Sequence, residues 1–331
     1  MSDSIVVVTE AEYKRAPTVF DLAPFTIHVA PAAEPDLARA IAAHRARHAV
    51  IGGSPYVDDL YAALGKGSVL ARYGVGYDGV DLPRATRAGI TCTNTPSVLD
   101  QSVAELTMLL IAAAARRLPN IAGRIHKEVW IPREGIELSG KTLAIIGSGR
   151  IGTSLARIAS AGYGMRVIGC RRSHPGTAPA PADSGYVLLT DDFQTAVRDA
   201  DFVSLLIPAM PENRHFINRE RLAMMPARAW LVNTARGMVV DEAALFEAVK
   251  SGQIAGAALD VYEREPYVPL DDAHDFRTLE NVVLTPHVGS YTGDANRGMA
   301  RRALGNIELF EAGRFAEMDL LNPAVLDEAR S

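Results

Sequence analysis

The sequence predicts an α/β protein made of two Rossmann-like, doubly wound domains with parallel sheets, the cofactor domain inserted into the substrate domain. Three observations predict this class. Short apolar runs alternate with helical patterns along the chain, which is typical of βαβ units. A glycine triplet lies between an apolar run and a helical run. The chain has 331 residues, of which 48% are apolar, and this length suggests two domains rather than one.

The first α/β domain is predicted from short β-branched or apolar runs. The expected strands are Ile5–Val8, Ala49–Ile51, Val69–Tyr73 and Ile90–Thr93. Helical patterns lie between them at Asp36–Arg47 and Pro83–Ala88. Three to five strands with their helices are enough for a domain of roughly a hundred residues.

A long helix is expected from Gln101 to Arg117, with Asp100 as its cap and Pro119 as its stop. The second domain contains the more strongly apolar runs. Its expected strands are Thr142–Ile146, Met165–Gly169, Tyr186–Leu189, Phe202–Ile207, Trp230–Asn233, Gly256–Leu259 and Val282–Leu284. Six or seven such strands with intervening helices make a full doubly wound sheet.

The last helical pattern, about Ala295 to Ala312, predicts that the chain returns to the first domain. On this interpretation residues 99–294 form a dinucleotide-binding domain. Residues 1–98 and 295–331 then form a discontinuous substrate domain.

Charge and cysteine content argue against several function classes. Lys and Arg total 34 against 39 for Asp and Glu, a net charge of −5, so nothing indicates binding to nucleic acid or to a membrane surface. Cys92 and Cys170 lie far apart, which argues against a disulfide framework or a structural zinc site. The N-terminus has neither the basic flank nor the length of a signal peptide, and the apolar stretch Leu106–Ala115 is about half the ~20 residues of a membrane helix. We expect a cytoplasmic protein.

Gly147, Gly149 and Gly152 form a G-x-G-x-x-G motif between the run Thr142–Ile146 and the helical run Thr153–Ala161. Such glycines allow a tight turn, close approach of the backbone to a pyrophosphate, and tight packing of helix on strand. The N-terminus of the helix then presents N–H groups to the phosphates. In this context the motif predicts dinucleotide binding rather than a plain tight turn.

The end of the next expected strand bears on the choice of cofactor. A fold that binds NAD usually carries an acidic residue about twenty residues beyond the glycines, which grips the ribose 2′-hydroxyl. Here Cys170 is followed by Arg171, Arg172 and Ser173. Two guanidinium groups and a hydroxyl suit a 2′-phosphate, so we predict that NADP(H) is preferred and NAD(H) is possible. The alternative is that both arginines are ordinary solvated loop residues.

Three charged residues follow the last expected strands. Arg236 lies after Asn-Thr-Ala, Glu265 precedes a proline, and His287 follows Thr-Pro. Because ligands of open α/β sheets bind beyond the carboxyl ends of the strands, the three side chains can converge beside a nicotinamide. Taken singly, each is more often a surface charge or a structural histidine.

The order of these segments resembles the D-isomer-specific 2-hydroxyacid dehydrogenase family. The resemblance runs from about Val69 to Asn306 and, besides the glycine motif and the three strand-end segments, includes Arg72–Asp81, Asn94–Pro96, Val103–Glu105 and Gly140–Thr142. It implies that Arg236, Glu265 and His287 are the catalytic residues.

The same resemblance implies binding roles. The loop of Gly74, Val75 and Gly76, whose backbone N–H groups can form an anion-binding nest, would bind the substrate carboxylate, together with Arg236 and His287. Asp260 would contact the carboxamide side of the nicotinamide. The glycines and Arg171 to Ser173 are predicted from the residues themselves. The resemblance adds six cofactor contacts: Arg150, Ile151, Pro208, Thr234, Ala235 and Gly289.

Reduction of a 2-oxo acid explains why these residue types are needed. A protonated His287 can give a proton to the carbonyl oxygen, and Glu265 beside it would favour the charged imidazole and fix its tautomer. Arg236 can bridge the substrate carboxylate and polarise the carbonyl. No metal is required.

The leading hypothesis is an NADPH-preferring reductase of small 2-oxo acids such as glyoxylate or hydroxypyruvate. One alternative is an NAD-dependent enzyme resembling phosphoglycerate dehydrogenase. Another is a non-enzymatic, dinucleotide-sensing protein resembling the family's transcriptional co-repressors. The resemblance also implies a homodimer built through the cofactor domain, to which the helix at Leu106–Ala115 would contribute.

Overall fold

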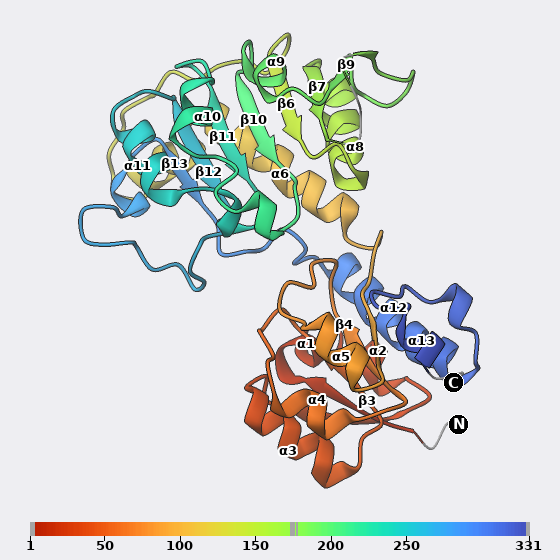
Figure 1. Cartoon of the computed structure of the whole chain (residues 1–331). Helices are drawn as coiled ribbons and strands as arrows, with labels where there is room; N and C mark the ends of the chain where they lie inside the picture. The colour runs from red at the N-terminus through yellow and green to blue at the C-terminus, as the bar shows by residue number, and fades with distance from the viewer. Residues whose placement is uncertain (1–3, 173–175, 177, 329–331) are drawn as a thin grey trace. The chain divides into compact units, whose positions relative to one another are not determined.

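The computed structural model describes residues 4–172, 176 and 178–328 and divides the chain into two compact units (Figure 1). Unit 1 comprises the residues up to Leu99 and those from Ser290 onward, and unit 2 is Asp100–Gly289. Unit 2 is therefore inserted into unit 1. Each unit is a doubly wound α/β fold with a parallel sheet, so the predicted fold class is confirmed.

The sheet of unit 1 has the strand order β2-β1-β3-β4-β5, and every pairing is parallel. Its strands are β1 (Ile5–Thr9), β2 (Thr26–Ala30), β3 (His48–Ile51), β4 (Ser68–Arg72) and β5 (Ile90–Thr93). This is the flavodoxin-like order of doubly wound sheets. β2 is missing from the expected strands because it is an edge strand whose residues are mostly half-buried or exposed, so it lacks a continuous apolar run.

Helices cover both faces of the unit 1 sheet (Figure 1). One face carries α3 (Glu34–His44), α4 (Asp59–Leu64) and α5 (Leu82–Arg87), and the other carries α1 (Glu10–Arg15), α2 (Pro17–Asp21) and α12 (Gly293–Glu311). The chain then closes through η5 (Phe315–Glu317) and α13 (Val325–Glu328).

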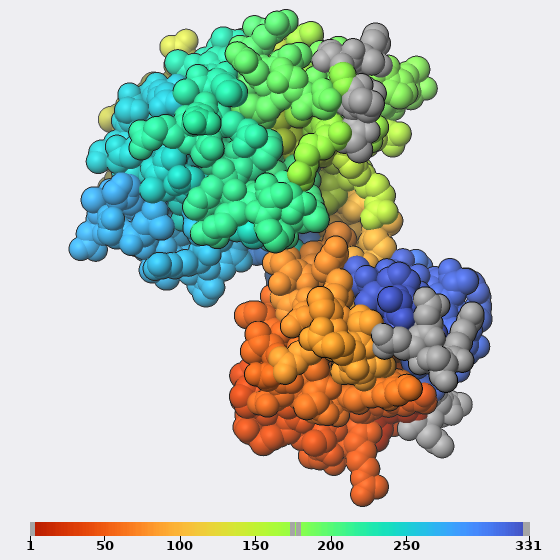
Figure 2. Space-filling model, in the orientation of Figure 1, coloured from red at the N-terminus to blue at the C-terminus, as the bar shows by residue number. Residues whose placement is uncertain are grey.

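A buried asparagine, Asn322, attaches the C-terminal segment to β5 of unit 1. The side chain of Asn322 accepts from the N–H of Cys92 at 2.7 Å and donates to the carbonyl of Ile90 at 2.9 Å. In the space-filling view the blue C-terminal segment packs against the red and orange N-terminal segment (Figure 2).

The sheet of unit 2 has the order β13-β12-β11-β10-β6-β7-β9-β8. Its strands are β6 (Thr142–Ile146), β7 (Arg166–Cys170), β8 (Ala178–Pro179), β9 (Leu188–Thr190), β10 (Phe202–Leu205), β11 (Trp230–Asn233), β12 (Gly256–Leu259) and β13 (Val282–Leu284). Seven of them are parallel, and β8 pairs with β9 in the antiparallel sense. Without β8 and β13 this is the strand order of the dinucleotide-binding fold.

Alternate residues of β6 face two different cores, which explains why this strand is apolar throughout. Leu143 and Ile145 pack in one core with α6 (Asp100–Ala115) and α8 (Arg150–Arg157). Ala144 and Ile146 pack in the other with α9 (Phe193–Val197), α10 (Arg219–Ala223) and α11 (Glu242–Lys250). The remaining short elements are α7 (Leu118–Ile125), η1 (Ile158–Gly162), η2 (Pro211–Asn213), η3 (Gly237–Val239) and η4 (Phe276–Thr278).

The helix expected from Gln101 to Arg117 begins and ends slightly earlier, as α6. Arg117 takes a left-handed backbone conformation with φ 51°, which ends the helical path. Pro119 does not act as a stop, because it lies in the first turn of α7, where proline is tolerated. Asp100 is the first helical residue, and its carboxylate accepts from Nε of Arg150 at 3.0 Å.

The strand order of unit 2 fixes where a ligand can bind. The chain moves outward in opposite directions from the neighbours β6 and β10, so their carboxyl ends flank a topological switch point.

No helix in the part of the chain that the structure describes is long and apolar enough to cross a membrane.

Candidate active site

The glycine motif lies directly after β6, at the switch point. A Cβ on Gly147 would lie 2.5 Å from the carbonyl oxygen of Leu206, and a Cβ on Gly152 would lie 2.5 Å from the carbonyl oxygen of Gly147. Both positions therefore need glycine for close backbone packing. A Cβ on Gly149 would meet no atom of the described residues within 4 Å, so Gly149 is open on this side.

This loop has the features that a dinucleotide needs. The Ser148 hydroxyl is buried and has no hydrogen-bond partner among the residues that the structure describes. The first turn of α8 begins at Arg150, directly after the open backbone of Gly149, and its N–H groups have no partner within the helix. An orphaned hydroxyl, open backbone and a helix N-terminus together fit a pyrophosphate.

The carboxyl end of β7 carries the arginines that bear on cofactor choice. The guanidinium of Arg172 donates to Oδ1 of the buried Asn213 at 2.9 Å, and Nδ2 of Asn213 donates to the carbonyl of Pro208 at 2.9 Å. Arg171 is exposed and donates its backbone N–H to Thr190. Ser173, the third residue of this prediction, lies outside the described residues.

Acidic residues lie near this strand end but come from the neighbouring strand. β9 ends at Thr190, which pairs with Cys170, and Asp191 and Asp192 follow directly. Burial, with the charges of Asp192 and Asp191, raises the pKa of the Cys170 thiol to about 11. The sequence contained this signal, because the carboxyl ends of neighbouring parallel strands meet at one edge of the sheet.

Glu265 and His287 form a hydrogen-bonded pair. Nδ1 of His287 donates to Oε2 of Glu265 at 2.6 Å, and the N–H of Tyr262 donates to the other carboxylate oxygen at 3.0 Å. Burial raises the pKa of the Glu265 carboxyl, but the hydrogen bond and charge of His287, the N–H of Tyr262 and the charge of Arg236 outweigh it and hold this pKa below its usual value. Glu265 is therefore a carboxylate near neutral pH.

The backbone of His287 is held in an unusual conformation. Its φ is 53°, in the left-handed region, which costs of order 1–3 kcal/mol for a residue other than glycine. Asp260 fixes this turn: its carbonyl accepts from the N–H of His287 at 2.8 Å, and its carboxylate accepts from the N–H groups of Val288 and Gly289 at 2.9 and 2.8 Å. Thr285 donates to the same carboxylate at 2.6 Å.

Asp260 is thus a positioning residue for His287. It is 1% exposed, and both of its carboxylate oxygens are engaged by this turn. The contact with a nicotinamide that the resemblance implies for Asp260 stays a prediction.

Arg236 is positioned by a buried asparagine that sequence reasoning missed. Oδ1 of Asn233 accepts from the N–H of Ala235 at 3.0 Å, and Nδ2 of Asn233 donates to the carbonyl of Arg236 at 2.9 Å. An asparagine that hydrogen-bonds the backbone two residues on is a common turn device, so the sequence did contain this signal. Between them, Thr234 is buried and its hydroxyl lies 2.8 Å from that of Thr107 in α6.

The predicted substrate loop lies in unit 1, after β4. Gly74 has φ 137°, and its N–H donates to the Thr95 hydroxyl at 2.9 Å. The N–H of Gly74 is thus used within the protein, and the predicted anion-binding nest would rest on the N–H groups of Val75 and Gly76.

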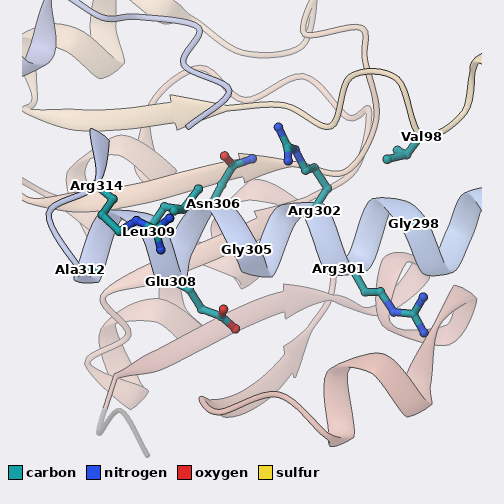
Figure 3. Close-up of a pocket in the computed structure, with 10 residues that line it drawn as sticks. All are labelled: Val98, Gly298, Arg301, Arg302, Gly305, Asn306, Glu308, Leu309, Ala312 and Arg314. Atoms are coloured by element: carbon teal, nitrogen blue, oxygen red, sulfur yellow. The ribbon is translucent and has the colours of Figure 1, made fainter. Parts of the chain in front are cut away.

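A cavity of about 700 Å³ runs along α12 in unit 1, and none of the predicted site residues lines it (Figure 3). Two of its three arginines are already in ion pairs. Arg302 pairs with Asp319, and Arg314 pairs with Glu317. The cavity is therefore a poor anion site. Within the described part of the chain, no group of three His, Cys, Asp or Glu side chains could hold a metal ion.

Comparison with known proteins identifies the family. Residues 108–289 match the family model described as D-isomer specific 2-hydroxyacid dehydrogenase, NAD binding domain. The chain belongs to the D-isomer specific 2-hydroxyacid dehydrogenase family. The resemblance predicted from the sequence is confirmed, and the protein is a nicotinamide-dependent oxidoreductase.

Curated members of this family are similar over most of the chain. A glyoxylate reductase from Thermococcus litoralis is 40% identical over 267 residues, which cover 78% of each chain. A D-3-phosphoglycerate dehydrogenase from Methanocaldococcus jannaschii is 40% identical over 281 residues, covering 84% of this chain and 52% of the relative. The chain thus spans about half the length of that second relative.

Solved structures of this family have the same fold with either cofactor. An NADPH-dependent glyoxylate/hydroxypyruvate reductase from Sinorhizobium meliloti, in complex with NADP and malonate, has a TM-score of 0.79, 28% identity and 94% coverage of both chains. A D-lactate dehydrogenase from Aquifex aeolicus, in complex with NAD and lactic acid, has a TM-score of 0.80, 25% identity and coverage of 96% and 98%.

Proposed function

We propose that this dehydrogenase reduces small 2-oxo acids such as glyoxylate or hydroxypyruvate, with Arg236, Glu265 and His287 as its catalytic residues. The observation that carries the proposal is the 2.6 Å hydrogen bond from His287 to an ionised Glu265 beyond the carboxyl ends of β12 and β13. Similarity to the glyoxylate reductase of Thermococcus litoralis supports the choice of substrate.

The hydrogen bond defines the role of each ring atom. Because Nδ1 of His287 donates to Glu265, Nε2 is the atom that gives a proton to the carbonyl oxygen during reduction and takes it back during oxidation. The Glu265 carboxylate accepts from Nδ1 and so keeps the ring in its orientation. A bound nicotinamide supplies the hydride.

Arg236 stabilises the charge that develops on the substrate. Its planar guanidinium can engage the substrate carboxylate and the carbonyl oxygen together, which an ammonium cannot do. The substrate carboxylate is also assigned to the N–H groups of Val75 and Gly76. The dinucleotide is assigned to the glycine motif, Arg150, Ile151, Pro208, Thr234, Ala235 and Gly289.

We further propose that NADP(H) is preferred to NAD(H). Arg172 supports this because Asn213 holds its guanidinium, and exposed Arg171 stands beside it. Asp191 and Asp192 oppose it, because negative charge near a 2′-phosphate is unfavourable. We expect the arginines to outweigh the two aspartates in the choice of cofactor. They follow β7, and the end of this strand carries the ribose-binding residue in dinucleotide folds.

A homodimer built through unit 2 is part of the proposal. The expected contributor Leu106–Ala115 lies in α6, most of which is buried in the core of unit 2. Large apolar side chains are instead exposed on α7 and the segment after it, and Trp130 is 85% exposed. Exposed apolar residues that cluster in this way are typical of an interface. We also propose a cytoplasmic location, which the two free and buried cysteines Cys92 and Cys170 support.

The test is an assay of the purified full chain in both directions. Reduction of a panel of 2-oxo acids is measured by the loss of NADPH or NADH absorbance, and oxidation of 3-phosphoglycerate with NAD⁺ by the gain of NADH absorbance. We expect turnover of glyoxylate and hydroxypyruvate. Turnover confined to 3-phosphoglycerate with NAD⁺ would support the phosphoglycerate dehydrogenase alternative, which similarity to the Methanocaldococcus jannaschii enzyme favours. Dinucleotide binding without turnover of any acid would support the sensor alternative.

A further inference from the structure

Glu242 and Glu263 form two reciprocal hydrogen bonds, a pair that we call the clasp. The N–H of Glu263 donates to Oε1 of Glu242 at 2.7 Å, and the N–H of Glu242 donates to Oε1 of Glu263 at 3.3 Å. The two residues belong to different segments. Glu242 is the first residue of α11, and Glu263 lies in the loop after β12.

Glu242 is an unexpected residue to bury. It is 4% exposed, and a buried carboxylate costs free energy unless hydrogen bonds compensate it. Burial, with the charges of Glu263 and Glu265, raises the pKa of Glu242 despite the N–H of Glu263. A hydrophobic residue would fill this position at lower cost, so the carboxyl group is expected to have a role there.

The clasp joins the two segments that carry the catalytic residues. Arg236 lies six residues before Glu242 in one segment, and Glu265 lies two residues after Glu263 in the other. A Cβ on Gly237 would clash with the carbonyl carbon of Tyr262, so the backbone beside Arg236 packs directly against the same turn. The Glu263 peptide is therefore held between Gly237 and Glu242.

The turn passes this constraint to Glu265. The N–H of Tyr262, the residue before Glu263, donates to Oε1 of Glu265, whose other oxygen accepts from His287. A shift of the Glu263 peptide would move this donor and, with it, the carboxylate. The charge of Arg236 already acts on Glu265, so the relative position of the two segments matters electrostatically.

We propose that Glu242 is a positioning residue of the reductase: its clasp with Glu263 sets Arg236 against the Glu265–His287 pair. This inference rests on the proposed function of those three residues. It assigns Glu242 no contact with substrate or cofactor.

The test compares three variants of the full chain. Glu242→Ala removes the acceptor of the Glu263 N–H, whereas Glu242→Gln keeps an acceptor oxygen of nearly the same shape. Asp241→Ala is the matched control. Asp241 caps the same helix by accepting from the N–H of Ala244 at 3.0 Å, and its side chain is not part of the clasp. Each variant is measured for thermal unfolding, for kcat and KM with glyoxylate, and for the Kd of NADPH by fluorescence.

We expect Glu242→Ala to lower kcat about tenfold to a hundredfold and to raise KM for glyoxylate, because misplacement of about 1 Å can cost about a hundredfold. The Kd of NADPH should stay within about twofold. Glu242→Gln should restore kcat to within a few-fold of the unmodified protein. Asp241→Ala should lower the unfolding temperature without an equal loss of kcat.

Two results would overturn the inference. If Glu242→Ala keeps its kcat below its unfolding temperature, the clasp is merely structural. If Glu242→Gln loses as much activity as Glu242→Ala, or if Glu242→Ala does not fold and Glu242→Gln is inactive, the acceptor geometry is not what matters. An unmodified protein that reduces no 2-oxo acid would instead contradict the proposed function.

Discussion

The two halves of the unit 2 sheet end differently. Beyond β11, β12 and β13, hydrogen bonds within the protein hold the segments of Arg236, Glu265 and His287: Asp260 alone accepts from three N–H groups and a hydroxyl. Beyond β6 and β7, the loop is incomplete: Gly149 faces open space and the Ser148 hydroxyl has no partner within the described residues.

This difference separates what the chain fixes in advance from what a ligand must complete. A satisfied hydrogen-bond network holds catalytic side chains in one geometry before the substrate arrives, which is what electrostatic catalysis requires. Open backbone and an orphaned hydroxyl are left for a dinucleotide to satisfy. Substitutions of Arg236, Glu265 and His287 should therefore change turnover, and substitutions in the glycine motif should change cofactor binding.

The largest effect is expected for His287→Ala. Removal of the proton donor should lower kcat by about 10² to 10⁴, since general acid catalysis is typically worth that much. The Kd of NADPH, measured by fluorescence, should stay within a few-fold of the unmodified value. Loss of cofactor binding with kcat preserved would show that the two halves are not separate in this way.

Arg236→Lys should have the next largest effect. The charge remains, but the planar fork that can reach carboxylate and carbonyl together is lost. A lost charge-assisted hydrogen bond costs roughly 1.5–3 kcal/mol, so kcat/KM for glyoxylate should fall by about 10- to 100-fold. If steady-state kinetics find lysine as good as arginine, the bidentate role is wrong.

Gly149→Ala and Gly152→Ala form a matched pair within the cofactor half. A methyl group on Gly152 would lie 2.5 Å from backbone and should destabilise the fold by about 1–3 kcal/mol. A methyl group on Gly149 meets no protein atom, so it should leave the unfolding temperature unchanged and raise the KM for NADPH. Thermal unfolding and cofactor titration separate the two. Equal destabilisation by both would mean that Gly149 serves the fold and not the ligand.

The smallest effect concerns the choice between cofactors. One good charge-assisted contact from Arg171 or Arg172 to a 2′-phosphate implies a preference of at least about tenfold for NADPH in kcat/KM. Arg172→Ala should reduce that preference, with NADH kinetics as the internal control. An NADH preference in the unmodified protein would mean that Asp191 and Asp192, and not the arginines, determine the choice of cofactor.

The sequence predicts the buried strands of unit 2 well because both faces of each strand pack in a core. Thr142–Ile146, Trp230–Asn233, Gly256–Leu259 and Val282–Leu284 are observed at their expected bounds. β2 escaped prediction because an edge strand needs no continuous apolar run. The break between α6 and α7 was not predicted, because it depends on the left-handed backbone of Arg117. The periodicity of apolar residues does not indicate the dihedral angle of one residue.

The candidate site shows the same division. Arg236, Glu265 and His287 each follow a recognisable strand, but it is the family resemblance of their segments that singled them out. The left-handed backbone of His287 and the engagement of Asp260 could not, because they depend on atoms more than twenty residues apart meeting in space. The Glu242–Glu263 clasp was missed for the same reason.

The pH dependence of the Glu265→Gln variant tests the central claim most directly. In the unmodified protein, reduction of glyoxylate should fall as pH rises through the apparent pKa of the pH–rate profile, because the proton donor is lost. The hydrogen bond and charge of His287 help to hold the pKa of Glu265 low. Glutamine removes this coupling, so the midpoint of the fall in kcat/KM should move to lower pH. An unchanged midpoint would contradict the claim that Glu265 and His287 act as one acid.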